Sequence, residues 1–449
     1  MEKAATGSAS RAVRQVRENT TGPSGTTAAT RSSAASGSDR PIAAASGAAT
    51  VSGKDTKSRS ASTTTATTTP STNANPHIKF KTTFRNTIYD TMLRRGWKET
   101  TDNDWDFYWA DREYIYELLD SVHLENGQRV NHFRNGRELC RKDHLIKNLK
   151  RAKRQMEKRA KAGEELTANE LEMGSYDFFP VTYTLPGEYS IFVEEFRRHQ
   201  GVWIMKPTSK AQGKGIFLFT KLSQISDWRT DYRAQGKGIF LFTKLSQISD
   251  WRTDYRWQPQ SQQVETYVVQ KYISNPYLVG GKKFDLRLYA LVPSFSPLEI
   301  YLYRGGFARF TNSRYSNNPS DIANSFIHLT NVAIQKTSEH YNKKHGGKWD
   351  LRNLKMYMMS KHGVEAINKL FYEIQMVIIK SVLSVEKIMI NDKHCFELYG
   401  YDIMIDENLK PWLLEVNASP SLSANTSSDY QLKCGMLNDM LDILDLENT

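Results

Sequence analysis

The sequence predicts a mixed α/β (α+β) protein that follows a disordered N-terminal tail. Three observations lead to this fold class. The composition changes after residue 76, from mostly Ser, Thr, Ala and Gly to a mixture of apolar and charged residues. Segments with period-two alternation are then interleaved with segments of helical periodicity. Near the C-terminus, two apolar segments flank a short turn, as in a β-hairpin.

Residues 1–76 contain no Phe, Tyr, Trp or Leu, and no Met after Met1. Such a segment cannot bury enough apolar surface to offset the entropy lost on ordering, so we expect a disordered low-complexity tail. The remaining residues, 77–449, are numerous enough for a sizeable core. The 449-residue chain carries 61 Lys and Arg against 49 Asp and Glu, a formal charge of +12.

The composition also excludes several classes of protein. No run of about 18 apolar residues could span a membrane, and the N-terminus lacks the apolar stretch of a secretory signal. Three cysteines in so long a chain do not form a disulfide framework or a metal cluster. They favour a reducing compartment inside the cell.

We expect three structured domains after the 1–76 tail: an N-terminal α/β domain (77–176), a central domain (177–264) and a C-terminal domain (265–449). The elements predicted in them, in chain order, are a strand at 79–84, a helix at 85–96, a strand at 105–111, a helix at 190–201, strands at 202–207, 265–273 and 284–292, and a helix at 363–389. The segment PVTYTLP at 180–186 opens the central domain. The helix at 363–389 carries an apolar stripe at i, i+3, i+4 spacing, and we expect it to pack in the core.

Residues 141–162 form a strongly basic block, with ten basic and two acidic side chains. The good helix formers in this block predict a helix with one basic side. That side is either a solvated surface or a docking surface for an acidic polymer, such as a nucleic acid or an acidic protein tail. Composition does not decide between the two.

Residues 211–233 recur without a change as residues 234–256. Two copies are too few for a solenoid, which needs at least about three repeats. Perfect identity indicates either a very recent duplication or an error in gene assembly. Because the first copy directly follows the strand at 202–207, we expect it to occupy the sheet and the second copy to be an insertion.

The C-terminal hairpin places oxygen-bearing side chains on one face. With a two-residue turn, Asp402 faces Leu413 across the ladder, and Glu415 and Asn417 follow on the same face because side chains alternate. Carboxylates buried among apolar strands are costly unless they are neutralised. Mg²⁺ is a hard ion that carboxylates hold together with nucleotide phosphates. We therefore predict a Mg²⁺ site at this hairpin, with a solvated edge as the alternative.

A glycine loop, KAQGKG at 210–215, follows the strand that contains Lys206. Glycines let backbone N–H groups approach phosphate oxygens, and the lysines add positive charge, so the loop suits a flap over phosphates. It matches neither GxxxxGK[ST] nor GxGxxG. Taken alone, it is equally compatible with an ordinary glycine hairpin.

The strand KKFDLRLY at 282–289 places Asp285, Arg287 and Tyr289 on one face. The planar fork of an arginine is suited to binding two phosphate oxygens. The alternative is an Asp–Arg pair on a solvent-exposed face. The sequence HLTN at 328–331 adds polar ligands, and Arg309 lies in another predicted strand.

Taken in order, Lys206, the QGKG loop, KFDLR, HLTN and the D…ExN hairpin resemble the tubulin–tyrosine-ligase-like family, whose members have the ATP-grasp fold. The resemblance covers residues 79–448 except for the second copy of the repeat. Stretches such as WDFYWAD, GGKKFDLRLY and KPWLLEVNASPSL are most similar to the polyglutamylase branch. The resemblance therefore implies an ATP-grasp fold with a small N-terminal α/β domain.

The resemblance also implies a role for individual residues. The ATP-binding residues would be Lys206, Gln212, Gly213, Gln270, Lys271, Tyr272, Ile273, Lys283, Phe284, Asp285, Thr330 and Asn331. The ligands of Mg²⁺, or of Mn²⁺ in its place, would be Asp402, Glu415 and Asn417. The residues that bind free glutamate and the acceptor would be Gln212, Arg309, Lys348 and Lys433. The catalytic residues would be Arg287, Arg309 and Glu415.

The activity implied is that of an ATP-dependent tubulin polyglutamylase. A glutamate side chain of a tubulin C-terminal tail would attack the γ-phosphate of ATP and become an acylphosphate. The amine of free L-glutamate would then displace phosphate and leave an isopeptide bond. Catalysis would rest on positioning and on offsetting the charge of the phosphates, with no side-chain nucleophile.

The expected partners are tubulin tails in microtubules, free L-glutamate and accessory subunits, with no nucleic acid and no membrane. The expected location is the cytoplasm and cytoskeleton, at the basal body or axoneme of a cilium or flagellum. Two alternatives stay open: a ligase of the same fold that adds glycine or tyrosine, and a non-catalytic protein that binds microtubules or nucleic acid. The three predicted metal ligands argue against the second, because a pure binder has no use for them.

Overall fold

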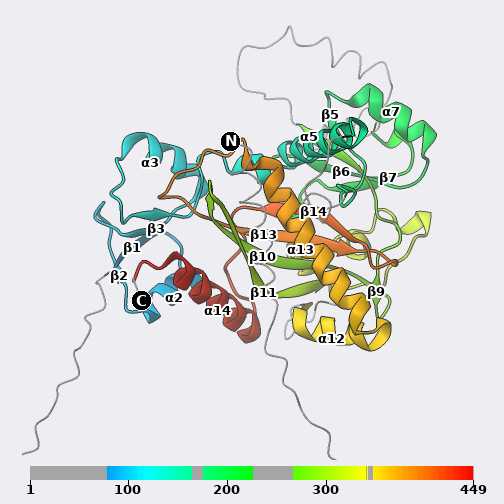
Figure 1. The fold of residues 1–449 in the computed structure, drawn as a ribbon. Helices are drawn as coiled ribbons and strands as arrows, with labels where there is room; N and C mark the ends of the chain where they lie inside the picture. Colours follow the sequence, from blue (N-terminus) through cyan, green and yellow to red (C-terminus); the bar gives the residue numbers. More distant parts are fainter. Residues whose placement is uncertain (1–77, 164–174, 226–265, 340, 342–346, 448–449) are drawn as a thin grey trace, which may run out of the picture. The chain divides into compact units, whose positions relative to one another are not determined.

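The computed structural model (Figure 1) describes residues 78–163, 175–225, 266–339, 341 and 347–447. These residues form three β-sheets together with helices, so the mixed α/β prediction is confirmed. The predicted tail and the second repeat copy lie outside the described residues. None of the described helices is long and apolar enough to cross a membrane.

The first sheet is parallel and has the strand order β2-β1-β3-β4. Its strands are β1 (Lys79–Thr82), β2 (Lys98–Glu99), β3 (Phe107–Trp109) and β4 (Arg129–Val130). Helix α2 (Thr87–Arg94) begins after Asn86, whose Oδ1 accepts a hydrogen bond from the Ile88 N–H at 3.1 Å. The chain leaves this helix through Gly96, whose φ of +81° favours glycine. The predicted end of this helix at Gly96 is therefore close to the observed one.

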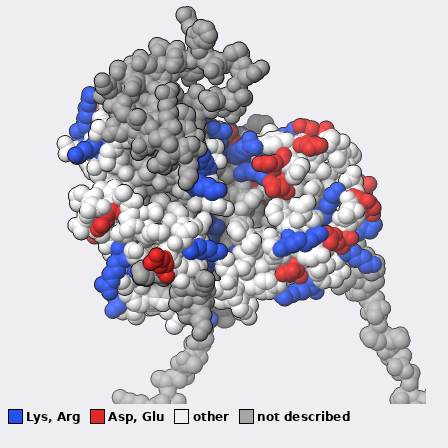
Figure 2. Space-filling view, turned by 180° about the vertical axis from the view of Figure 1, so that it is seen from behind, with Lys and Arg blue, Asp and Glu red and all other residues white. Residues whose placement is uncertain are grey.

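Short helices connect this sheet to the basic block; they are η1 (Arg112–Tyr114), α3 (Ile115–Ser121) and α4 (Arg137–Cys140). The block itself forms α5 (Lys142–Lys161), as predicted. Part of its charge is used within the fold, since Lys150 Nζ lies 3.0 Å from Glu188 and Arg151 donates to the Ser384 carbonyl oxygen at 3.0 Å. On the described part of the face in Figure 2, basic and acidic side chains alternate rather than forming a field of one sign.

The central sheet is antiparallel and has the order β5-β8-β6-β7. Its strands are β5 (Thr182–Leu185), β6 (Trp203–Pro207), β7 (Phe217–Phe219) and β8 (Tyr267–Lys271). Helix α7 (Tyr189–Arg198) covers it with an aromatic core, in which Phe192 packs on Trp203 and Phe196 stacks on Phe219. The first repeat copy thus supplies strand β7, as expected.

The large sheet is antiparallel and has the order β12-β11-β10-β13-β14, with β9 beside β10. Its strands are β9 (Leu278–Val279), β10 (Lys282–Phe295), β11 (Leu298–Phe310), β12 (Lys348–Asp350), β13 (Glu397–Ile405) and β14 (Pro411–Asn417). Most positions of β10 and all positions of β13 are buried. A strand buried on both faces can carry charged side chains only where ion-pair or hydrogen-bond partners lie next to them.

Three helices cover the large sheet (Figure 1): α12 (Leu351–His362), α13 (Val364–Glu386) and α14 (Ser427–Leu444). The stripe of α13, including Ile367, Leu370 and Ile374, packs into the main core with Leu286 of β10, which confirms that this helix is a core element. Helix α14 packs with the first sheet in a second core, which contains Tyr289. The two cores therefore lie on opposite faces of β10, because 286 and 289 differ in parity.

The predicted register of the C-terminal hairpin is wrong by two residues. Asp402 pairs with Glu415 rather than with Leu413, which pairs with Ile403. Two irregularities cause the shift. The turn contains one residue more than predicted, with Leu409 in a left-handed conformation (φ +62°), and a bulge leaves Leu414 unpaired. Because two residues are one full period, the acidic side chains keep their common face.

The predicted domain boundaries stay a prediction. Strand β8, which the sequence places at the start of the C-terminal domain, pairs with β5 and β6 in the central sheet. This pairing favours a central unit that extends through Lys271.

Candidate active site

A cavity lies where the central sheet meets the large sheet. Strands β6, β8, β10, β11, β13 and β14 contribute to its walls, with the short helix α10 (Ser325–His328) and the residues just before α11 (Val332–Gln335). The residues that the resemblance assigns to ATP, metal or glutamate and that line this cavity are Lys206, Gln270, Lys271, Tyr272, Ile273, Lys283, Asp285, Arg309, Thr330, Asn331, Asp402 and Glu415. Segments far apart in the sequence thus meet in one place.

Two buried lysines reach the cavity from different sheets, Lys206 on β6 and Lys283 on β10. Lys206 Nζ donates to Gln270 Oε1 at 2.7 Å. Lys283 Nζ donates to Tyr272 Oη at 2.8 Å and to the His328 carbonyl oxygen at 2.9 Å. Burial lowers the pKa of Lys206 to about 8 and the pKa of Lys283 to about 7. An anionic ligand between them would raise both pKa values, so the pair suits phosphate.

The segment 270–273 lies along the cavity wall and consists of the last two residues of β8 and the two residues after it. Its backbone is fixed on both sides, since Lys271 N–H donates to the Val181 carbonyl oxygen at 2.8 Å and Tyr272 N–H donates to that of Val202 at 3.1 Å. The Lys271 side chain is directed elsewhere, because its Nζ donates to the carbonyl oxygen of Gln200 at 2.8 Å. Lys271 therefore contributes backbone rather than charge to the cavity.

Four charged side chains form a buried network at the floor of the site. Arg287 holds Asp402 with two donors, Nε at 2.6 Å and Nη2 at 3.1 Å. Arg309 Nη2 also binds Asp402, at 2.7 Å, and Arg309 Nε donates to Asp285 at 2.9 Å. None of the four is more than 9% exposed. Burial alone would raise the pKa of Asp402, but the two guanidinium groups hold it well below its usual value.

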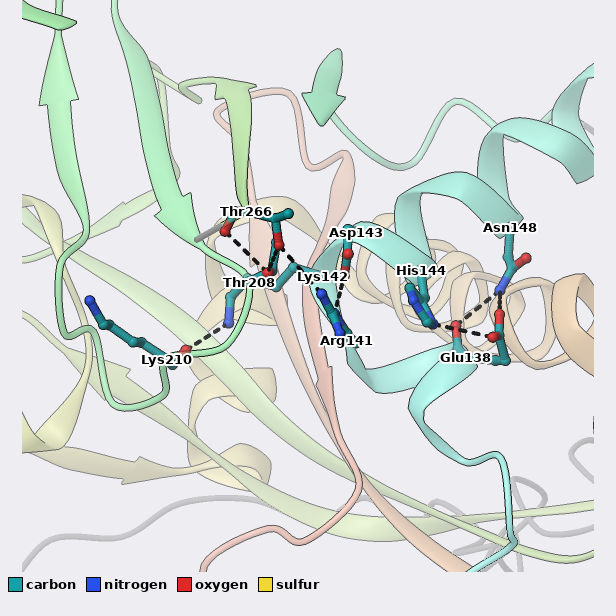
Figure 3. Close-up of polar contacts among 9 residues, drawn as sticks. All are labelled: Glu138, Arg141, Lys142, Asp143, His144, Asn148, Thr208, Lys210 and Thr266. Atoms are coloured by element: carbon teal, nitrogen blue, oxygen red, sulfur yellow. Dashed lines mark hydrogen bonds and ion pairs between the residues drawn. The ribbon is translucent and has the colours of Figure 1, made fainter. Parts of the chain in front are cut away.

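Glu415 lies opposite Asp402 in the β13–β14 ladder, and its side chain is 25% exposed. Lys142, the first residue of α5, places Nζ 3.5 Å from Glu415 Oε2. The same Nζ donates to the carbonyl oxygen of Lys210, in the glycine loop, at 3.2 Å (Figure 3). The start of the basic helix therefore contacts both a predicted metal ligand and the loop that follows β6.

The residues predicted to bind a metal fit a hard divalent cation. Asp402 and Glu415 offer carboxylate oxygens on one face of the hairpin, and Asn417 donates through Nδ2 to the Gly400 carbonyl oxygen at 3.3 Å. The described residues contain no group of three or more His, Cys, Asp and Glu placed to hold a metal. Two carboxylates and an amide are few ligands, which suits Mg²⁺ that is shared with phosphate oxygens.

The glycine loop after β6 packs against the segment that begins α11. Gln212 and Gly213 both have positive φ, +61° and +78°. A Cβ on Gly213 would lie 2.6 Å from Ile334 Cδ1 and 3.1 Å from Asn331 Oδ1. The loop thus packs so closely against Asn331 and Ile334 that a side chain at position 213 would require both of these side chains to shift.

We expect Gly213→Ala to reduce activity by about tenfold to a hundredfold, because displacing the loop by an ångström misplaces Gln212 and the backbone N–H groups. Initial rates at saturating substrates measure the effect. Gly96→Ala is the matched control, since Gly96 has φ +81° but a Cβ added there would meet no atom within 4 Å. Equal activity losses in both variants would show that strain, not the contact with α11, is responsible.

Lys348 and Lys433, predicted to bind glutamate, lie together beyond Arg309. Lys348 is the cross-strand partner of Arg309 in the β11–β12 ladder. Both lysines bind one oxygen of Asp429, at 2.8 Å and 3.2 Å. Burial lowers the pKa of Lys433 to about 8. The three predicted glutamate-binding cations are therefore neighbours.

Seven predicted residues are not among those that line the cavity: Gln212, Gly213, Phe284, Arg287, Lys348, Asn417 and Lys433. The side chain of Phe284 packs in the main core, on the opposite face of β10 from Lys283 and Asp285. Gln212 is exposed on the glycine loop. Any contact of Phe284 with a nucleotide would therefore be made by its backbone.

Sequence reasoning missed two residues of this region. Lys142 was counted only as part of the basic block, although it lies beside Glu415. Asp429 was not singled out, although Thr426 and Asp429 form the start signal of a helix, with the Asp429 N–H donating to Thr426 Oγ1 at 3.2 Å. The three-residue spacing of Thr426 and Asp429 could have predicted that the helix start holds Asp429 in place. It could not have predicted which lysines bind Asp429.

The comparisons with known proteins agree with this geometry. Residues 121–233 and 228–448 match the family described as the tubulin-tyrosine ligase family, and the match divides within the repeated segment. The probable tubulin polyglutamylase TTLL9 of Bos taurus is 48% identical over 378 residues, which cover 82% of this chain and 80% of that protein. The probable tubulin polyglutamylase ttll-9 of Caenorhabditis elegans is 45% identical over 373 residues, which cover 82% and 81%. The probable alpha-tubulin polyglutamylase Ttll1 of Tetrahymena thermophila is 45% identical over 382 residues, which cover 83% and 86%.

The motifs of this sequence resemble the polyglutamylase branch, and in particular its member numbered nine, and these relatives confirm that resemblance. The family match extends over both sides of the cavity and over the buried charged network. The chain therefore belongs to the tubulin-tyrosine ligase family.

Proposed function

We propose that this protein is an ATP-dependent tubulin polyglutamylase, which joins free L-glutamate by an isopeptide bond to glutamate side chains of tubulin C-terminal tails. Membership of this ligase family implies the use of ATP. The observation that carries the proposal is the arrangement of Glu415 opposite Asp402, above the network of Arg287 and Arg309 and beside the two buried lysines. Relatives with 45–48% identity bear the name of probable tubulin polyglutamylases.

On the nucleotide side, Lys206 and Lys283 would bind phosphate oxygens, and segment 270–273 would border the base. Asp402, Glu415 and Asn417 would hold Mg²⁺, or Mn²⁺ in its place. When bound, such an ion offsets negative charge on the phosphates and orients them. Arg287 fixes the Asp402 carboxylate through two hydrogen bonds, so the position of this ligand is set before any substrate arrives.

The reaction needs no side-chain nucleophile. A γ-carboxylate oxygen of the acceptor attacks the γ-phosphorus of ATP, the bond to the bridging oxygen breaks, and ADP leaves. The deprotonated amine of free glutamate then attacks the acyl carbon, and phosphate leaves as the amide forms. In both steps, negative charge develops on oxygens, and the cations Lys206, Lys283 and Arg309, which line the same cavity, would stabilise it.

The choice of glutamate would depend on Arg309, Lys348 and Lys433. Free glutamate carries two carboxylates, whereas glycine and tyrosine carry one. A second carboxylate needs a fixed cation that the α-carboxylate does not already occupy, and the paired lysines beside Arg309 supply it. This arrangement favours glutamate over the glycine and tyrosine alternatives.

The acceptor and the location follow from the same proposal. Tubulin tails are acidic, so the exposed basic side chains of α5 would attract them, and salt would weaken this attraction. The protein would act on the cytoskeleton, at the basal body or axoneme of a cilium or flagellum. Accessory subunits would contribute to its binding to the microtubule.

The test is the incorporation of radiolabelled glutamate into microtubules by the full chain with ATP and Mg²⁺. We expect incorporation that requires ATP and disappears when proteolysis has removed the tubulin tails. Excess unlabelled glycine or tyrosine should not compete. A variant that lacks residues 234–256 is assayed in the same way. Incorporation of glycine or tyrosine instead would support another ligase of the fold, and no incorporation by either form would contradict the proposal for the isolated chain.

Nucleotide binding is expected to weaken as the pH rises. Burial gives Lys283 and Lys206 pKa values of about 7 and about 8, so both lysines lose protons between pH 7 and pH 8.5 in the protein without nucleotide. ATP needs them protonated, and its Kd should rise by at least about tenfold over this range. Titration with a fluorescent ATP analogue measures this. In Lys283→Arg the cation stays charged, so the dependence should become shallower; a flat wild-type profile would contradict the prediction.

A further inference from the structure

The carboxylate of Asp429 lies between two lysines from different elements. Lys348 Nζ, at the start of β12, donates to Asp429 Oδ2 at 2.8 Å. Lys433 Nζ, one turn further along α14, lies 3.2 Å from the same oxygen. Asp429 is 5% exposed and Lys433 is 2% exposed. One buried carboxylate oxygen therefore joins two cations that are distant in sequence.

The position of Asp429 is fixed by the backbone at the start of α14. The N–H of Asn425 donates to Asp429 Oδ2 at 3.1 Å, and the N–H of Asp429 donates to Thr426 Oγ1 at 3.2 Å. Lys433 has one further contact, a hydrogen bond of 2.6 Å to the Ser423 carbonyl oxygen. The carboxylate is thus held rigidly, and the lysines take their positions from it.

The lysine pair continues the charged network of the active site. Lys348 lies directly opposite Arg309 in the β11–β12 ladder, and Arg309 lines the cavity. Residues opposite each other in an antiparallel ladder share one face of the sheet. The two lysines and Arg309 therefore form one cationic cluster, which extends from the cavity to α14.

This cluster has unused hydrogen-bonding capacity. A lysine ammonium group has three N–H donors. Among the described residues, the hydrogen bonds of Lys348 use one of these donors and those of Lys433 use two. Asp429 Oδ1 and Tyr289 Oη, which are buried nearby, have no partner among the described residues. Buried polar groups are normally satisfied, so this gap indicates that a polar ligand completes the cluster.

We propose that Asp429 is a positioning residue, which holds Lys348 and Lys433 side by side as a paired grip for a carboxylate of the incoming amino acid. The inference rests on the proposed function and names the residue that orders its amino acid site. Asp429 acts through the lysines. It offsets the repulsion between two neighbouring cations, and burial would otherwise favour their neutral forms, as the pKa of about 8 for Lys433 indicates.

A purely structural role as a helix cap makes a different prediction. In Asp429→Asn, the amide oxygen can still accept the Asn425 N–H, so the start of α14 is preserved. The charge between the lysines is lost. A cap alone would therefore leave the kinetics of this variant unchanged, whereas a positioning residue would not.

The experiment measures KM and kcat of glutamate incorporation into microtubules for the wild type and for Asp429→Asn. We expect KM for glutamate to rise by at least about tenfold, since a charge-assisted hydrogen bond is lost, while KM for ATP stays within about twofold. Asp439→Asn is the matched control, with the same substitution at an exposed position of the same helix. It should behave as the wild type does.

An unchanged or lower KM for glutamate in a folded Asp429→Asn variant would overturn the inference. If circular dichroism shows that this variant does not fold, Asp429→Glu decides. It keeps the charge but moves it by one methylene, and we expect KM for glutamate to rise by about threefold, so an unchanged value would overturn the inference. A wild type that does not incorporate glutamate would contradict the proposed function instead, before any variant is compared.

Discussion

Glutamate incorporation by a Glu415→Gln variant is expected to fall by about a hundredfold to a thousandfold, with little change in stability. Glutamine keeps the size and shape of the side chain but removes the charge opposite Asp402. It also leaves Lys142 without its carboxylate partner at 3.5 Å. Losses of this size are typical when one electrostatic group is removed from a preorganised site. Initial rates with labelled glutamate measure the loss, and thermal unfolding measures the stability.

Glu407→Gln provides the control for that variant. Glu407 lies in the turn of the same hairpin, where its exposed carboxylate accepts a hydrogen bond from Asn275. Its replacement should leave the rate within about twofold of the wild type, because exposed polar contacts contribute little. Full activity in Glu415→Gln would exclude this carboxylate as a metal ligand and would require another residue in that role.

Asp402→Asn is expected to lower the free energy of unfolding by about 3–5 kcal/mol, because it leaves Arg287 buried without a carboxylate. Arg309 keeps Asp285 as a partner, but Arg287 has lost both of its hydrogen bonds to a charged acceptor. The amide nitrogen of asparagine would in addition face a guanidinium group. Such a loss is a large share of the 5–15 kcal/mol that typically stabilises a domain. Urea unfolding followed by tryptophan fluorescence measures it.

The comparison variant is Asp442→Asn at the surface. Asp442 pairs with Arg95 at 2.7 Å, but its side chain is 62% exposed. We expect this variant to lose less than about 1 kcal/mol. If Asp402→Asn were no less stable than Asp442→Asn, the buried network would not hold the strands together, and its arginines would have to be kept charged by groups other than Asp402.

The face of the C-terminal hairpin could be predicted from the sequence, but its register could not. Alternation of side chains determines which residues share a face, and this placed Asp402 and Glu415 together. The register depends on the turn and on any bulge. Leu409 adopts a left-handed conformation that leucine rarely takes, and Leu414 bulges out of the ladder. Neither feature has a signal in the local sequence.

Contacts between residues distant in sequence were the second feature that could not be predicted from the sequence. The strand at 282–289 predicted a shared face for Asp285 and Arg287, yet these two do not pair with each other. Each binds a residue from another strand, because β11 and β13 flank β10 on either side. Lys142 was missed for a related reason. Charge within a basic helix gives no indication of which residue reaches into another part of the fold.

The pairing of β7 and β8 with the same strand, β6, has a consequence for the evolution of this chain. Phe219 lies opposite Trp203 and Tyr267 lies opposite Pro207. With strands about 4.8 Å apart and a rise of about 3.3 Å per residue, the ends of the stretch between Phe219 and Tyr267 are roughly 16 Å apart whatever its length. Doubling a loop between fixed ends adds only about 0.6 kcal/mol of closure entropy. Duplication of a segment at this position is therefore expected to change the free energy of folding very little. Insertions could persist there during evolution, and a reporter domain could be inserted at the same position.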